Sequence, residues 1–187
     1  FKRIGQKHSQ RAVIEAARGE YEGFQVAVLA PARHGFEKIR IETGDLKGTD
    51  GATIPSSRIE WGWVRDITTE PPDIPVPFVG PIPDAIMEGT TSFDVAAGSF
   101  TPVVFRVYVD QDTKPGVYEG GIVFVSGERR IRVPVTLKVR NFTLPSRGSL
   151  KMAFSFFEKY YQEWYKLSAM TEEKQSYLYE FLLKYRI

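Results

Sequence analysis

The strongest constraint on the fold of this chain is a change of hydrophobic period near Asn141. Before that point apolar and polar residues alternate, most clearly between Ile131 and Val139, where every second residue is apolar and half of the others are charged. After Pro145 the large apolar residues recur at spacings of three and four. Alternation of apolar and polar residues is typical of half-buried β-strands, whereas spacings of three and four are typical of amphipathic helices. The sequence therefore predicts an all-β region followed by a region containing helices.

The alternating region predicts seven or eight short strands separated by turn residues. Further examples are Phe24 to Val28 and Val103 to Val109, and the last two long strands form a predicted hairpin across Ser126-Gly127. Many short strands without helices between them indicate two packed antiparallel sheets, a β-sandwich. Pro134 lies within the last strand and cannot donate to a ladder, so we expect that strand to run at a sheet edge or to carry a bulge.

The segment after the sandwich predicts one strand and two helices. Leu150 to Phe154 is a short apolar run, and Thr171 is a predicted N-cap for the second helix. A single strand-helix unit cannot bury a parallel strand, which needs strand neighbours and helices on both faces. We therefore predict a sandwich domain at 1–146 and, at 147–187, the opening of a larger α/β domain that exposes unusual aromatic surface.

Composition excludes several classes of function. The sequence has no cysteine, which excludes disulfides, thiolate catalysis and cysteine-ligated zinc. The net charge of +2 gives no argument for nucleic-acid binding, and no run of about 18 apolar residues predicts a membrane span. The two histidines have no carboxylate at a ligand spacing, so we expect neither metal nor cofactor. The chain opens on Phe1, so we expect that an upstream segment has been removed.

Two further segments are interpreted structurally. The proline-dense stretch at residues 70–84 predicts a stiff, extended loop lying across a neighbouring surface. The arginines at 129, 130 and 132 lie at the base of the predicted hairpin, where a solvated outer face is the expected environment.

Candidate binding residues lie in two places. Glu158 follows the predicted strand after the sandwich and is a candidate for a hydrogen bond to a ligand, with a helix-start or solvated carboxylate as the alternative. Phe156 and Phe157 are candidates for an apolar platform under a ligand ring, with ordinary packing as the alternative. Trp61 and Trp63 share one face of a strand. They are candidates either for sugar stacking or for packing at an interface, because large aromatic side chains bury much area.

Several segments together resemble the N-terminal region of glycoside hydrolase family 123 and its uncharacterised relatives. They are EAARGEYEGFQVAV (15–28), RIEWGWV (58–64), PDAI (83–86), FDVAAGSFTPVVFRVYVDQDTKPGVYEGGIVFV (93–125) and VPVTLKVRNFTLPSRGSLKMAF (133–154). The resemblance implies a β-sandwich joined to a (β/α)₈ barrel, whose active site lies at the strand ends. One departure is Phe78-Val79-Gly80-Pro81, where relatives often have tryptophans.

The resemblance also implies a function. Family members remove β-linked N-acetylgalactosamine, using the substrate's acetamido group as nucleophile beside an Asp-Glu pair that lies in the barrel beyond Ile187, so no residue here is expected to be catalytic. The implied partner is a glycan that binds through the rest of the barrel, in a secreted, periplasmic or cell-surface enzyme, and the chain alone is expected to be inactive. The alternatives are a stand-alone carbohydrate-binding module and an immunoglobulin-like interaction module. The glycan, the linkage and the oligomeric state stay open.

Overall fold

The computed structural model describes residues 9–147 and 155–184. Contacts divide the chain into two compact units, Phe1–Leu144 and Pro145–Ile187, which are described separately below. Strands make up the first unit and helices the second, so the prediction of a mainly β chain is confirmed. The strand predicted at Leu150 to Phe154 lies outside the described residues.

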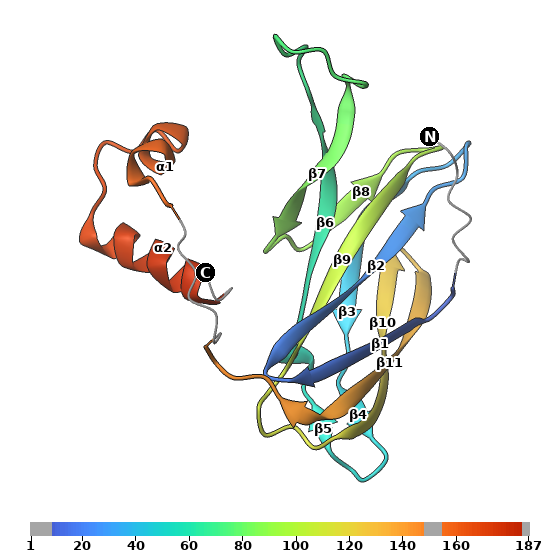
Figure 1. The fold of residues 1–187 in the computed structure, drawn as a ribbon. Helices are drawn as coiled ribbons and strands as arrows, with labels where there is room; N and C mark the ends of the chain where they lie inside the picture. The colour runs from blue at the N-terminus through green and yellow to red at the C-terminus, as the bar shows by residue number, and fades with distance from the viewer. Residues whose placement is uncertain (1–8, 148–154, 185–187) are drawn as a thin grey trace. The chain divides into compact units, whose positions relative to one another are not determined.

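The first unit contains two β-sheets in the part of the chain that is described (Figure 1). The larger sheet has the order β1-β11-β10-β3-β8, with β4 beside β10 and β5 beside β4. Its strands are β1 (Ala12–Arg18), β3 (Phe36–Thr43), β4 (Leu46–Gly48), β5 (Thr53–Ile54), β8 (Phe93–Val95), β10 (Gly116–Ser126) and β11 (Arg129–Thr143). The second sheet has the order β2-β9-β6-β7. Its strands are β2 (Glu20–Leu29), β6 (Ile59–Thr68), β7 (Pro81–Glu88) and β9 (Phe100–Val109), and a short 3₁₀ helix, η1 (Ser56–Arg58), precedes β6.

The prediction that both sheets are antiparallel is wrong for one pair of strands. β1 runs parallel to β11, with Ala12 opposite Val135 and Ala16 opposite Val139, so the larger sheet is mixed. A parallel pair needs a long connection between its strands. Here the whole of the first unit supplies that connection, since β1 and β11 are its first and last strands.

Gly19 carries the chain from one sheet to the other. It is the one residue between β1 and β2 and has a φ of 82°, a left-handed conformation that is strained for any residue with a Cβ atom. Its N–H donates to the carbonyl oxygen of Val109 at 2.6 Å. The turn at Gly19 therefore joins the edge strand of the larger sheet to the edge strand of the other.

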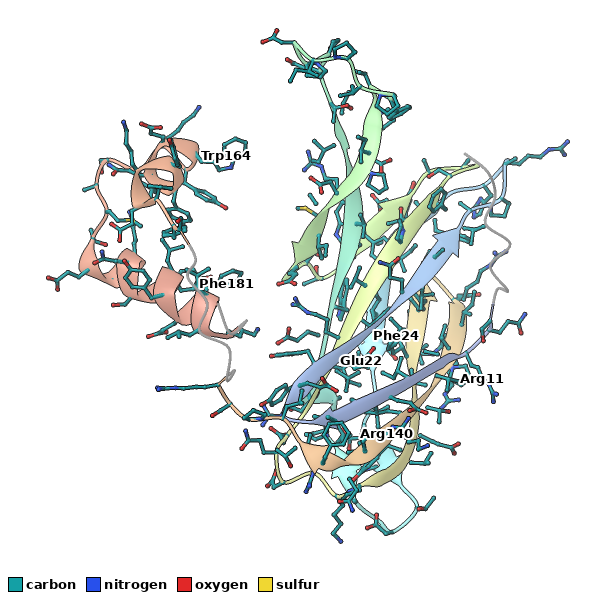
Figure 2. The ribbon with its side chains drawn as sticks, viewed as in Figure 1. Arg11, Glu22, Phe24, Arg140, Trp164 and Phe181 are labelled. Carbon is teal, nitrogen blue, oxygen red and sulfur yellow. The ribbon has the colours of Figure 1, made fainter. Side chains whose placement is uncertain are left out.

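A single hydrophobic core takes side chains from both sheets. Phe105 of β9 and Phe124 of β10 meet edge to face, with 6.1 Å between ring centroids, and Phe24 of β2 stacks on Phe105 (Phe24 is labelled in Figure 2). Fully buried members include Leu46, Val103, Val107, Val109, Ile122 and Leu137. The alternation in the sequence thus selects the inward-facing residues of each strand.

The hairpin predicted across Ser126-Gly127 is confirmed, but β11 is not an edge strand. β10 pairs along the whole of β11, with Pro134 opposite Gly121, while β1 covers the other side of β11 from Val135 onward. Among the described residues, Pro134 therefore lies just before the β1 ladder begins. That position fits a residue without an N–H group, because no ladder bond is required of it on that side.

The hairpin formed by β6 and β7 extends beyond the rest of its sheet (Figure 1). Thr69 and Gly80 close its neck: the N–H and hydroxyl of Thr69 donate to the carbonyl oxygen of Gly80 at 2.9 and 3.1 Å, and the N–H of Gly80 donates to the hydroxyl oxygen at 3.1 Å. The proline-dense tip between them exposes apolar side chains at Ile74, Val76 and Phe78.

The second unit contains two helices, α1 (Glu158–Trp164) and α2 (Glu172–Lys184). The predicted N-cap is confirmed, since the N–H of Lys174 donates to the hydroxyl oxygen of Thr171 at 3.4 Å. Tyr177, Leu178 and Phe181 are among the apolar residues of α2 that recur at spacings of three and four. Leu178 is buried, whereas Tyr177 and Phe181 are exposed. The helices therefore bury little of their apolar surface within the described part of this unit.

Candidate functional site

The aromatic residues around α1 form the candidate site of the second unit. A pocket of about 350 Å³ is lined by Ser155, Phe156, Phe157, Tyr160, Tyr161, Trp164 and Tyr165. The rings contact one another, with 5.7 Å between the centroids of Phe157 and Tyr160 and 4.6 Å between those of Tyr161 and Tyr165. Trp164 is 82% exposed. Such a surface can hold an apolar group or the face of a sugar ring.

Glu158 lies beside this pocket but is engaged with α2. Its Oε1 accepts hydrogen bonds from the side-chain amide of Gln175 at 2.5 Å and from the hydroxyl of Tyr179 at 2.8 Å. The bond from Gln175, followed by that from Tyr179, holds the pKa of the Glu158 carboxyl below its ordinary value, because both stabilise the charged form. The bond to Glu158 raises the pKa of Tyr179. In the described structure, Glu158 therefore links α1 to α2.

Sequence reasoning missed Gln175 and Tyr179 as partners of Glu158. The signal was present, since the two residues are four apart on a predicted helix and so share one face. That face differs from the face formed by the large apolar residues that recur at spacings of three and four.

Trp61 and Trp63 lie in the first unit, on the face of β6 that packs against the core. Both rings approach Phe93 of β8, with centroid distances of 6.5 Å for Trp61 and 6.1 Å for Trp63, and the Trp63 ring lies nearly parallel to Phe93. They bridge the two sheets, because β6 and β8 belong to different ones. The contacts give these residues a place in the core, and they are not brought together with Phe156, Phe157 or Glu158 within one unit.

The outer face of the second sheet carries an ordered polar and aromatic network. Arg106 of β9 forms ion pairs with Glu60 of β6 at 2.9 Å and with Glu88 of β7 at 2.6 Å. The hydroxyl of Tyr21 donates to Glu60 at 3.3 Å, and the Tyr21 ring packs against Tyr108 with 4.8 Å between centroids. The charged and polar groups of this network pair with one another, and the pairs connect the four strands of the sheet.

The described residues were compared with the requirements of a metal site and of a membrane-spanning helix, and they meet neither. They contain no group of three or more His, Asp or Glu residues placed to hold a metal ion. In the same part of the chain, neither helix has the length and apolar character needed to cross a membrane.

Comparison with known proteins gives one family and one informative structure. The profile of the family described as "Glycoside hydrolase 123 N-terminal domain" matches residues 2–126. A family 123 glycoside hydrolase from Clostridium perfringens, whose structural analysis concerns glycolipid glycan hydrolysis, has a similar fold with a TM-score of 0.64 and 18% identity. The match covers 74% of this chain and 24% of that protein, so this chain spans about a quarter of its length.

A pilin subunit shows a weaker structural likeness to this chain. The CooA pilin subunit from enterotoxigenic Escherichia coli aligns over 70% of this chain and 91% of its own, but with a TM-score of 0.36 and 9% identity, which is too weak to use. A search of curated proteins gave no match.

Proposed function

This chain belongs to the glycoside hydrolase 123 N-terminal domain family, and we propose that it is the non-catalytic amino-terminal part of a longer glycoside hydrolase. The observation that carries the proposal is the family match over residues 2–126, which falls within the two-sheet unit. The likeness to a family 123 enzyme about three times as long supports it.

In this proposal the two units have different roles. Residues 1–146 are a β-sandwich accessory domain, and residues 147–187 begin a (β/α)₈ barrel that needs further strands and helices to close. The proposal draws support from the second unit, where two helices leave Trp164 and Tyr177 largely exposed. Aromatic side chains of this size bury large areas in a finished domain, so the remainder of a barrel would provide their packing.

The proposed role of the sandwich is structural. Its two sheets partly bury the aromatic candidates Trp61 and Trp63, which pack against Phe93. The proline-dense tip between Thr69 and Gly80 instead offers exposed apolar side chains on a stiff backbone. We assign this tip to packing on a neighbouring surface of the complete enzyme.

We place catalysis outside this chain. Glycoside hydrolysis needs acidic groups held around the bond that breaks, and the candidate acid here, Glu158, is occupied by hydrogen bonds from Gln175 and Tyr179. The proposed substrate is a glycan that ends in β-linked N-acetylhexosamine, such as N-acetylgalactosamine. Phe156 and Phe157 are proposed to lie at the rim of its binding site. A secreted, periplasmic or cell-surface location is part of the same proposal.

An activity comparison tests this function. The 187-residue chain and the polypeptide encoded by the complete open reading frame are purified, and each is incubated with an aryl β-N-acetylgalactosaminide. We expect release of the aryl group by the longer polypeptide and none by the shorter one. Turnover by the pure 187-residue chain would refute the non-catalytic assignment, and a reading frame that ends near Ile187 would refute the hydrolase parent.

A further inference from the structure

Three arginines and one glutamate lie together on the outer face of the larger sheet. Arg40 and Glu42 belong to β3, Arg130 and Arg132 belong to β11, and β10 runs between these strands. The register across β10 sets Arg40 level with Arg130, and Glu42 level with Arg132. Given ordinary strand geometry, the two levels are about 7 Å apart and the two outer strands about 10 Å apart. We call these four residues the arginine cluster.

The arginine cluster carries more positive than negative charge. Arg130 forms a two-pronged ion pair with Glu42, in which Nη1 and Nη2 donate to the two carboxylate oxygens at 3.2 and 2.5 Å. Within the described residues, neither Arg40 nor Arg132 has a carboxylate partner. The hydrogen bonds from Arg130, with a further contribution from the charge of Arg40, lower the pKa of Glu42. One carboxylate therefore balances one of three guanidinium groups.

The guanidinium of Arg132 is fixed against the sheet. Its Nη2 donates to the carbonyl oxygen of Gly120 at 2.7 Å. A Cβ atom at position 121 would come within 2.7 Å of its Nε, so the glycine there provides the space in which the group lies. Because its partner is a neutral carbonyl group, the positive charge of Arg132 stays uncompensated. The guanidinium is also already held in place, so little further side-chain entropy is lost when an anion binds.

A second group of cations lies toward the other end of β11. Lys138 and Arg140 both pair with Glu15 of β1, Lys138 at 3.8 Å (Arg140 is labelled in Figure 2). The single carboxylate of Glu15 therefore balances one of these two positive charges. Arg132 and Lys138 are separated by six residues, or about 20 Å along an extended strand. Between them the outward positions of β11 are the uncharged Pro134 and Thr136, and the exposed Glu119 of β10 lies opposite Thr136.

We propose that the outer face of the larger sheet, from the arginine cluster to Lys138 and Arg140, binds a linear polysaccharide that carries sulfate or carboxylate groups. Guanidinium groups bind both kinds of oxyanion through paired hydrogen bonds. Arg130 and Arg132 of the arginine cluster lie on β11, as do Lys138 and Arg140, so a single extended chain running along β11 contacts both groups. This site goes beyond the proposed function, and it requires no catalytic activity.

The same residues fit other polyanions less well. Proteins that bind single-stranded nucleic acid combine cations with aromatic side chains on which bases stack, and amphipathic surfaces that bind lipid use Trp, Phe or Leu as anchors. The arginine cluster includes no aromatic residue, whereas Phe142 is 54% exposed two residues beyond Arg140 on β11. A polysaccharide needs no such anchor when its charges provide the attraction.

A double substitution, Arg40→Ala with Arg132→Ala, tests the site in the 187-residue chain. Neither side chain has an ion-pair partner in the described structure, so their removal leaves no carboxylate unpaired. The matched control is Arg33→Ala with Arg65→Ala, which removes the same charge from exposed positions in a loop and on β6. Far-UV circular dichroism checks that both variants keep their strands. Binding of a defined chondroitin sulfate oligosaccharide is measured by titration at several salt concentrations, with a neutral dextran, a DNA duplex and phosphatidylserine vesicles as comparison ligands.

We expect the wild-type chain and the control variant to bind the sulfated oligosaccharide equally and to ignore dextran. The double variant should bind at least about tenfold more weakly, and its plot of log affinity against log salt should be shallower by about two. No binding by the wild-type chain would overturn the proposal, as would equal loss in both variants or tighter binding of DNA or vesicles.

Discussion

The close approach of β4 to β10 depends on the absence of a side chain at Gly120. An ideal Cβ atom there would lie 2.6 Å from Cδ2 of Leu46 and 2.8 Å from the carbonyl oxygen of Asp45. Leu46 is fully buried, so its side chain has little room to move. The substitution Gly120→Ala must therefore displace backbone as well as a packed side chain.

The expected cost follows from two opposing effects. Overpacking of a well-packed core costs roughly 1–3 kcal/mol, and the lower chain entropy of alanine in the unfolded state returns about 0.4–1 kcal/mol. We expect Gly120→Ala to lower the free energy of unfolding by about 1–2 kcal/mol. Gly44→Ala is the matched control, because a Cβ atom there meets only an ordinary contact of 3.7 Å with the carbonyl oxygen of Gly121. The control should change stability by less than about 0.5 kcal/mol or increase it slightly.

Urea unfolding followed by tryptophan fluorescence measures both variants. The chain has three tryptophans, and Trp164 belongs to the second unit, so a Trp164→Phe background leaves Trp61 and Trp63 to report on the first unit alone. A shift of the midpoint at an unchanged m-value is the expected signature for Gly120→Ala. Equal midpoints for Gly120→Ala and Gly44→Ala would refute the steric reasoning.

Three further predictions concern single hydrogen-bonding groups. Tyr118→Phe removes a buried hydroxyl that donates to the Lys114 carbonyl oxygen at 2.8 Å, and should cost about 1 kcal/mol in the same unfolding assay; an unchanged midpoint would contradict this. The carboxyl of Glu158 has a lowered pKa when folded, so its contribution to stability is present above the pKa of the unfolded state and is lost as pH falls through the folded value. A ¹³C NMR titration should show this lowered value, and an ordinary pKa would contradict the linkage to α2. Thr69→Val removes both hydroxyl bonds to Gly80 and should speed exchange of the Gly80 amide, with little effect on overall stability; unchanged exchange would mean that the neck does not depend on them.

Much of the fold could be predicted because alternation reports which residues face a core. The β10–β11 hairpin follows from two alternating runs around Gly127, whose positive φ of 57° suits the turn. The parallel pairing of β1 with β11 could not be predicted in this way, because alternation specifies faces and not neighbours. The environment of Pro134 depends on that same pairing: β1 covers β11 from Val135 onward, so β11 is not an edge strand. The ladder is irregular between Val139 and Thr143, so the alternative expectation of a bulge in this strand fits the register.

The candidate sites show the same limit. The sequence places Arg130 and Arg132 on one outward face, but the cluster also needs Arg40, which the register across β10 brings level with Arg130. Glu158 is a candidate from its place after the predicted strand, whereas its engagement by Gln175 and Tyr179 depends on how two helices pack. Long-range neighbours of this kind are set by tertiary contacts, which hydrophobic period alone does not encode.

In our interpretation, the described residues of the first unit (9–144) form a packed domain, whereas α1 and α2 belong to a larger domain whose other elements provide their packing. Hydrogen exchange of the 187-residue chain, followed by mass spectrometry, tests this most directly. We expect strong protection of amides in β9, β10 and β11 and much weaker protection of amides in α1 and α2, because short helices with little tertiary packing are marginal in water. Protection of both helices equal to that of the central strands would contradict the interpretation.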